Sequence, residues 1–445
     1  YNPLSTMKKL LLLSLVALAL PMYGQRTFEV SQPQFDAFFH DSTVAMFYYR
    51  EGHRTWDTAY LAPNGFRVKG HSGWAGSHTQ LLDPINNGDY RLMVLDEATQ
   101  RPIYSRTYNT LFREYRDTPP GKDSVARFEE VMLFPLPLKP VTVCLQQRDE
   151  QQQFFTKHTF RLDPTESLPS CVTKHTASPA LIVNGSASME KIDLAVVAEG
   201  YGPDDIEKMM SDGSKLAQEL FFHTEPFKSR RTDFNLWLVP AVGEASGVTD
   251  PTKGIAVESA VGASFNTFDI ERYLMTMNLF RLHEVLANTP TDHIVILVNS
   301  DGYGGGAIYN FYALTSVNAM MRYILPHELG HSIGGLADEY VDTELSYNDM
   351  HKETMEPIEP NITSLVDFDS KWKDMLDPST PIPTPPCGKR IKPMRNCGPL
   401  GVYEGGGYKP KGIYRPVMNC MMNYYAPFCP VCTKALHTMF DLYTK

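Results

Sequence analysis

The segment His327-Glu328-Leu329-Gly330-His331 constrains this chain more than any other part of its sequence. Two histidines four residues apart lie on one face of an α-helix, so both imidazole rings can reach the same ion. Glu328 between them is placed to take a proton from a water that such an ion activates. Zinc, Zn2+, is the metal expected for two histidines and a third protein ligand around an open fourth position. The alternative is a surface helix that carries two histidines.

The residues around this segment predict where a third ligand comes from. Gly334-Gly335 ends the helix and lets the chain reverse, because glycine tolerates positive φ. Asp338 and Glu339 then bring two carboxylates back toward the histidines, and either one can complete a tetrahedral site. A solvated acidic turn is the alternative. Pro326 cannot donate an intrahelical hydrogen bond, so the helix must begin near it or kink there.

The chain of 445 residues divides into two predicted domains. Residues 26–178 contain short strand-like runs between turn signals, which predicts an all-β sandwich without a catalytic constellation. Residues 179–445 begin with strand-like runs that alternate with helical patterns, which predicts an α/β layer. The expected strands are 44–49, 90–95, 141–145, 192–197, 234–239 and 293–298, and the expected helices are 204–222 and 270–286.

Residues 1–25 predict a signal peptide. Lys8 and Lys9 precede an apolar run, residues 10–20, that is too short to span a membrane, and Met7 is the expected start. The signal peptide predicts an exported protein in the periplasm, at the cell surface or outside the cell. We see no second candidate span, so we expect the mature protein to be soluble. The formal net charge of −10 and the lack of a basic cluster argue against nucleic-acid binding.

The seven cysteines are concentrated near the C-terminus, with five after residue 386. In an exported protein these cysteines can oxidise, so we expect structural disulfides among them without an assignable connectivity. Cys429-Pro430-Val431-Cys432 lacks the context of a thioredoxin motif. A structural metal shared by Cys397, Cys420, Cys429 and Cys432 is the alternative, although their spacing is not that of a zinc ribbon.

Several motifs occur together in the second half of the chain: residues 299–306, 308–313 and 327–340, and Arg415-Pro416 ahead of Cys420-Met421-Met422. In this combination the chain resembles the IgA-cleaving metallopeptidase family of gut bacteria, within the metzincin-like zinc peptidases. The resemblance covers about residues 190–445, and the β-rich half resembles the domain that often precedes this catalytic domain. It implies an α/β (α+β) zincin-type fold.

The resemblance also implies roles for residues near the C-terminus. Metzincin-like enzymes have a methionine below the metal as an apolar floor, and Met422 is the best match, followed by Met421. In some such enzymes a tyrosine two residues later binds the metal or the oxyanion, which is the position of Tyr424. A tyrosine packed in the core is the alternative for that residue.

The third metal ligand follows from the same comparison. The usual metzincin ligand lies six residues after the second histidine, where this chain has Ala337, which cannot bind a metal. Asp338 is one residue further on and Glu339 two, and one extra residue is easier to absorb in a glycine turn. We therefore expect Asp338 to be the ligand and Glu339 to orient a histidine ring.

Gly304-Gly305-Gly306 lacks the lysine and hydroxyl residue of a phosphate-binding loop. We expect it to let the backbone approach closely before a strand at residues 307–314. An edge strand beside the metal could bind an extended peptide by β-augmentation, and a structural bulge is the alternative.

Together these features predict a secreted zinc-dependent endopeptidase that hydrolyses protein or peptide substrates, with Glu328 as the base. The family's name suggests host glycoproteins such as IgA. One alternative is a metal-dependent amidase that acts on cell-wall material. The other is a non-catalytic binding module with a vestigial site, which the intact Glu328 disfavours. Because the N-terminal half carries no visible chemistry, we expect it to be dispensable for catalysis.

Overall fold

The computed structural model describes residues 31–71, 73–172, 178–183, 191–343, 350–386 and 398–444. The expected signal peptide and two of the late cysteines, Cys387 and Cys397, lie outside these residues. Within the described ranges, none of the helices combines the length and apolar character needed to cross a membrane.

The N-terminal region consists of two antiparallel sheets, ordered β2-β1-β5 and β4-β3-β6-β7. Alternate residues of β3 are buried, as expected for a strand with one face on a core. Met46 of one sheet and Leu92 of the other belong to the same hydrophobic cluster, so the sheets pack face to face. The strands are β1 (Phe39–His53), β2 (Trp56–Val68), β3 (Tyr90–Asp96), β4 (Pro102–Tyr108), β5 (Ala126–Pro137), β6 (Val141–Arg148) and β7 (Phe154–Leu162).

The C-terminal region is built on one mixed sheet, ordered β12-β13-β11-β9-β10-β8. Its inner neighbours are parallel, whereas β12 and β8 run antiparallel at the two edges. All residues of β9 and β11 are buried, which is typical of strands covered on both faces. The strands are β8 (Ala180–Val183), β9 (Ile192–Tyr201), β10 (Phe234–Val242), β11 (His293–Val298), β12 (Gly305–Ile308) and β13 (Tyr312–Ser316).

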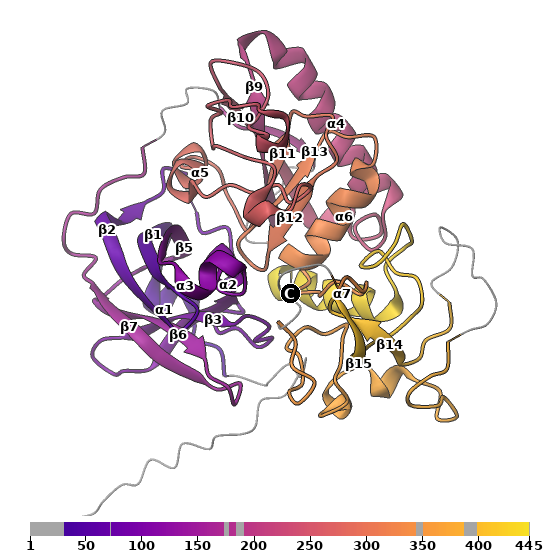
Figure 1. Ribbon diagram of the computed structural model, residues 1–445. Coiled ribbons are helices and arrows are strands. Elements are labelled where there is room, and N and C mark those ends of the chain that lie inside the picture. Colours follow the sequence, from indigo (N-terminus) through magenta and orange to yellow (C-terminus); the bar gives the residue numbers. More distant parts are fainter. Residues whose placement is uncertain are drawn as a thin grey trace, which may run out of the picture.

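Different layers cover the two faces of this sheet (Figure 1). One face packs against α4 (Ile206–His223), α6 (Met321–Ser332) and α7 (Pro430–Thr444). The other face packs against α5 (Leu279–Val285) and against β1 and β5 of the N-terminal region, in a second shared cluster. The two regions are therefore joined by a common hydrophobic core.

The remaining elements are short. The N-terminal region carries α1 (Phe35–Phe38), α2 (Leu111–Tyr115) and α3 (Pro119–Asp123). Near the C-terminus, β14 (Tyr403–Gly406) and β15 (Lys409–Arg415) form an antiparallel pair. This pair lies below α6 and α7 in the view of Figure 1, and it contacts the chain that follows α6 through a hydrogen bond from the backbone amide of Gly407 to the carbonyl of Asp338.

Helix α6 carries the paired histidines and packs against β12 and β13. It begins at Met321, so Pro326 lies inside the helix rather than at its start. At the other end, Gly335 adopts a φ of 59°, and its amide donates to the carbonyl of His331. This left-handed residue reverses the chain as the sequence predicts, and glycine adopts that conformation without steric cost.

Candidate active site

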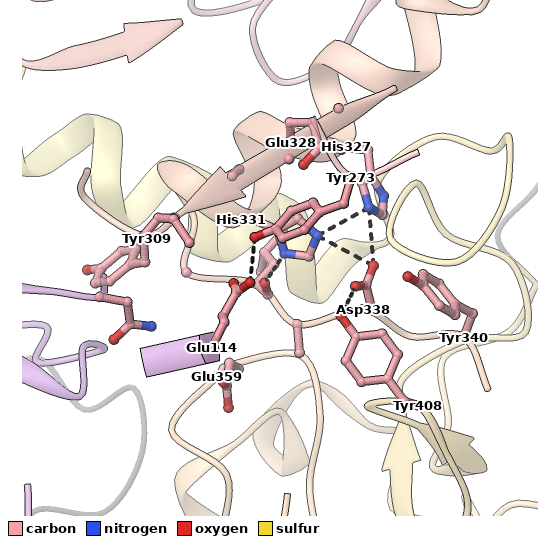
Figure 2. A pocket seen from close by; sticks show the side chains of 18 of the residues that line it. Glu114, Tyr273, Tyr309, His327, Glu328, His331, Asp338, Tyr340, Glu359 and Tyr408 are labelled. Atoms are coloured by element: carbon pink, nitrogen blue, oxygen red, sulfur yellow. Dashed lines mark hydrogen bonds and ion pairs between the residues drawn. The ribbon is translucent and has the colours of Figure 1, made fainter. Parts of the chain in front are cut away.

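His327, His331 and Asp338 converge on one point (Figure 2). The Nε2 atoms of the two histidines are 3.2 Å apart. Oδ1 of Asp338 lies 3.1 Å from Nε2 of His327 and 3.4 Å from Nε2 of His331. Ligand atoms at the corners of a zinc tetrahedron lie about 3.3 Å apart when the bonds are about 2.0 Å long. The spacing of the three atoms therefore fits a common metal ion.

Both histidine rings are oriented by backbone carbonyls at their other nitrogen. Nδ1 of His327 lies 2.9 Å from the carbonyl oxygen of Met421, and Nδ1 of His331 lies 2.6 Å from that of Leu336. A carbonyl can only accept, so each Nδ1 carries the hydrogen. In the neutral ring, Nε2 then has a free lone pair, which is the form that binds a metal.

Asp338 is buried, and its two oxygens have different surroundings. Oδ2 accepts a hydrogen bond from the hydroxyl of Tyr408. Oδ1 faces the two histidines but has no hydrogen bond of good geometry among the described residues. A buried carboxylate oxygen without a hydrogen bond is costly unless it binds a cation. The donor set and this oxygen both suit a divalent metal.

The pKa values of the residues in this cluster are strongly shifted. Burial disfavours the charged imidazolium of His331, but the Asp338 carboxylate outweighs burial and raises the pKa of His331 to about 9. Burial likewise opposes ionisation of Asp338, yet the two histidines hold the pKa of that carboxyl well below its usual range. Asp338 therefore remains an anion in the interior, which attracts positive charge to the point where the rings meet.

Glu328 lies in the cleft beside the edge strand β12. A Cβ atom at Gly305 of that strand would come within 2.6 Å of Oε1 of Glu328, so a larger residue there would displace this carboxylate. The glycine run thus permits a close approach, as the sequence predicts. Burial raises the pKa of Glu328 above its ordinary value.

The chain after Gly335 is held by residues that the sequence analysis missed. The side chain of Asn361 accepts from the amide of Ala337 at 2.8 Å and donates to its carbonyl at 2.9 Å. Tyr408 fixes the carboxylate of Asp338. These contacts bring Asp338 to the histidines although it lies beyond the end of the helix.

Glu339 points away from the histidines, contrary to the expected orienting role. Its Oε1 accepts from Asn361 at 3.0 Å and lies 3.2 Å from Sγ of Cys432. The backbone carbonyls of Met421 and Leu336 take the place expected for Glu339 at the histidine rings. The turn that directs Asp338 toward the histidines directs the next residue, Glu339, to the opposite side.

The methionines and Tyr424 occupy different places. Met422 is buried, and its Sδ would lie 2.6 Å from a Cβ at Gly330, so it packs against α6 between the two histidine positions. Met421 contributes its carbonyl to His327. Tyr424 lines the cleft and is 50% exposed, so it is not the packed core residue that was the alternative for it.

The cleft has a volume of about 480 Å³ and is lined by both regions of the chain. Glu114 of α2 reaches it from the N-terminal region, and its carboxylate accepts a hydrogen bond from the hydroxyl of Tyr273. Burial is the main reason that the pKa of Glu114 rises to about 7. The sequence did not identify four further residues as part of the cleft lining: Arg272, Tyr303, Tyr340 and Tyr408. This lining argues against the expectation that the N-terminal half is dispensable.

Two family models match this chain. Residues 181–396 and 388–440 match the family model described as IgA Peptidase M64. Residues 34–159 match the model described as Peptidase M64 N-terminus. A comparison with curated proteins finds no match. The first model covers more than half of the chain and includes the paired histidines, and M64 is a metallopeptidase family. The chain therefore belongs to the M64 peptidase family.

Proposed function

We propose that this protein is a zinc-dependent endopeptidase in which His327, His331 and Asp338 hold the metal and Glu328 is the general base. The observation that carries the proposal is the convergence of three ligand atoms beside a carboxylate in one cleft. The site has three protein ligands, which leaves a fourth position for a reactant, as in other catalytic zinc sites.

Each part of the site has a separate role in peptide hydrolysis. A zinc ion held by His327, His331 and Asp338 would act as a Lewis acid, which would polarise the scissile carbonyl and make water more acidic. The Glu328 carboxylate takes the proton of the attacking water and then delivers it to the nitrogen of the leaving amine. Tyr424 lines the exposed side of the cleft, and we propose that its hydroxyl donates a hydrogen bond to the oxyanion that develops on the carbonyl.

Strand β12 is suited to hold an extended substrate. It is the edge of the sheet and lines the cleft next to Glu328. Gly305 uses its outward amide and carbonyl to pair with Arg272 and Leu274. Because the pattern alternates along a strand, Ala307 presents its amide and carbonyl to the same outer side. A peptide that adds to β12 at this position would run along the cleft.

Protein substrates outside the cell are the proposed targets, with host glycoproteins such as IgA among them. The family description supports a peptidase that acts on such proteins, and the signal-like residues 1–25 support export. An open cleft lined from two regions suits a folded protein with an accessible extended loop.

The test is to incubate the mature protein with a mixed protein pool that includes IgA, and to map new termini by mass spectrometry. A parallel reaction contains peptidoglycan. Chelation should abolish cleavage, and zinc should restore it. New internal termini in proteins support the endopeptidase. Release of cell-wall fragments without protein cleavage would instead identify the amidase, and binding without any cleavage would identify a binding module.

A further inference from the structure

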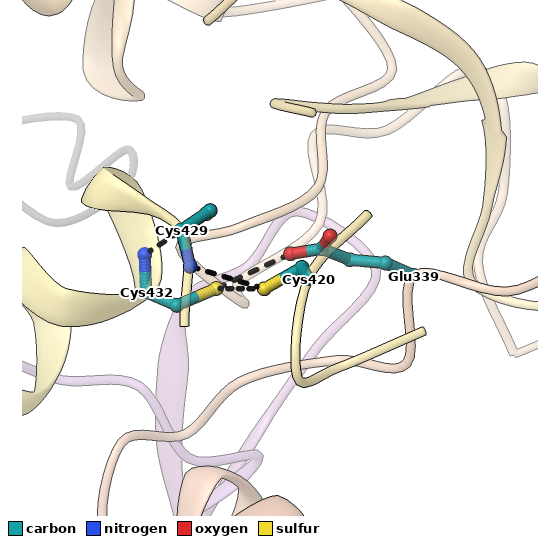
Figure 3. Close-up of side chains that lie close together, drawn as sticks. All are labelled: Glu339, Cys420, Cys429 and Cys432. Carbon is teal, nitrogen blue, oxygen red and sulfur yellow. Dashed lines mark hydrogen bonds between the residues drawn. The ribbon is translucent and has the colours of Figure 1, made fainter. Parts of the chain in front are cut away.

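A second cluster of metal-binding side chains lies apart from the histidines. Glu339, Cys420, Cys429 and Cys432 are all fully buried, and each offers one ligand atom within 4.8 Å of the other three (Figure 3). From this arrangement we propose a structural zinc site with three thiolate ligands and one carboxylate ligand, separate from the catalytic metal.

The distances in the cluster fit four ligands around one ion. Sγ of Cys420 and Sγ of Cys432 are 3.6 Å apart, and Sγ of Cys432 lies 3.2 Å from Oε1 of Glu339. With zinc–sulfur bonds of about 2.3 Å and a zinc–oxygen bond of about 2.0 Å, a tetrahedron places its sulfurs about 3.8 Å apart and sulfur and oxygen about 3.5 Å apart. The side chains are thus already near the positions that coordination requires.

The carboxylate of Glu339 supplies an independent reason for a cation. It has no exposed surface, and its Oε2 has no hydrogen-bond partner among the described residues. Arg415 acts on its charge, but from beyond ion-pair distance, and no ion pair to this carboxylate forms among the described residues. A buried, unpaired carboxylate costs several kcal/mol in principle, and a metal ion removes that cost by direct coordination.

Hydrogen bonds from backbone amides favour the thiolate form of the cysteine sulfurs. The amide of Cys429 donates to Sγ of Cys420 at 3.3 Å, and the amide of Cys432 donates to Sγ of Cys429 at 3.5 Å. Cys429 directly precedes α7, so its sulfur lies at the positive end of a helix dipole. Each thiol that binds the ion releases its proton to solvent, as zinc binding to cysteine requires.

A disulfide explains the cluster less completely. Cys420, Cys429 and Cys432 are free thiols, so the disulfides expected from the sequence do not form among these three, while Cys387 and Cys397 lie outside the described residues. One disulfide would use two of the three sulfurs and would leave both the third thiol and Oε2 of Glu339 without a partner. A zinc ion engages all four groups, and with four protein ligands and no exposed surface it has no open position for a reactant.

The site would position the catalytic centre through the backbone. Glu339 follows Asp338 directly, and its amide donates to the carbonyl of Met422 at 2.8 Å. Cys420 precedes Met421, whose carbonyl orients His327. A metal at the cysteines would therefore tie together the two chain segments that hold one ligand and orient another.

The test counts metals and thiols in the full mature chain purified without chelators. Elemental analysis should find two zinc ions per chain in the natural protein and one in both His327→Ala and Cys432→Ser. Cys144→Ser, which changes a buried free cysteine of the N-terminal region, should keep both. A natural protein with a single zinc that His327→Ala removes would overturn the proposal.

Two further measurements do not depend on how well Cys432→Ser folds. When the natural protein is unfolded with chelator and alkylated without reductant, Cys420, Cys429 and Cys432 should all be modified. A disulfide between any two of them would overturn the proposal. After cobalt replaces zinc, a thiolate-to-cobalt absorption band in the near ultraviolet should persist in His327→Ala, and its absence there would also overturn the proposal.

Discussion

Glu328 lies in the cleft beside Gly305, and the three proposed ligand atoms converge without it. We therefore expect Glu328→Gln to keep the zinc of the histidine site while activity falls about 10²–10⁴-fold, because the amide cannot accept the proton of water. Elemental analysis and peptide cleavage measure the two effects. Activity close to that of the natural protein would contradict the assigned mechanism.

A substitution of Gly305 tests the position of the Glu328 carboxylate without changing that residue. In Gly305→Ala the new Cβ would lie 2.6 Å from both Oε1 of Glu328 and Cγ2 of Ile324, so the end of the Glu328 side chain must move. A displacement of about 1 Å at a catalytic group can cost about 10²-fold in rate, so kcat should fall by roughly that factor with zinc content unchanged. Gly243→Ala is the control, since its nearest neighbour would be 3.5 Å away. Equal kcat in the two variants would rule out this positioning of Glu328.

At the scale of elements, α2 connects the N-terminal region to the cleft. Glu114→Ala removes the hydrogen bond from Tyr273. Above pH 7, where Glu114 is mostly charged, this bond contributes about 1.5–3 kcal/mol, and only part of that can affect the substrate, so kcat/KM should fall by up to about tenfold, mainly through a higher KM.

Glu129→Ala is a matched control for this prediction. It removes a hydrogen bond between the same two regions, from the amide of Phe280 at 2.9 Å, but Glu129 does not line the cleft. Steady-state kinetics should show normal KM for this control. If Glu114→Ala behaves like the control, the N-terminal region is dispensable for catalysis after all.

The sequence predicted elements well where the signal is local. Continuous apolar runs gave the strands 192–197, 234–239 and 293–298, which are β9, β10 and β11. The helix expected at 270–286 begins only at Leu279, because Leu274 and Met275 pair instead with Gly305 and Ser264. Backbone pairing with distant residues overrides a helical pattern, and such pairing is invisible in a local window.

The strand expected at 307–314 is also different in the structure. It is a hairpin in which β12 ends at Ile308 and β13 begins at Tyr312. Asn310 between them has a φ of 50°, a conformation that asparagine tolerates better than most residues. The aromatic and β-branched residues on both sides concealed this turn.

The contrast between local and long-range signals also applies to the residues of the site. The paired histidines are predictable because their spacing alone places them on one helix face. Tyr408 lies 70 positions from Asp338, and Glu114 lies 159 positions from Tyr273, so no spacing rule joins them. The glycine turn was enough to predict that Asp338 lies near the histidines. The partners of Glu339 could not be predicted, because Cys432 comes near it only in the folded chain.

At the scale of the whole molecule, two buried histidines set a limit on acid stability. Burial is the main reason that the pKa values of His283 and His293 fall to about 3, with Lys69 and Arg106 adding to the effect. In the unfolded chain a histidine has a pKa of about 6.5. Below that pH the unfolded chain binds protons that the native protein does not, so stability falls as the pH decreases toward 3.

Each of these histidines should lower the free energy of unfolding by about 1.4 kcal/mol for every pH unit below about 6. His283→Gln should therefore reduce the slope of stability against pH by that amount between about pH 6 and 5. Denaturant unfolding at several pH values measures the slope. His40→Gln, at an exposed position, should leave it unchanged, and identical slopes in all three proteins would contradict the prediction.

The consecutive carboxylates of Asp338 and Glu339 face two different clusters. This makes the length of the stretch after Gly335 as restricted as its composition. Deleting or inserting one residue there would turn each carboxylate toward the wrong partners, because successive side chains of an extended stretch alternate sides. Surface loops of related proteins can accept changes in length over evolution. Here we expect relatives to vary by substitution while the number of residues between Gly335 and Glu339 stays fixed.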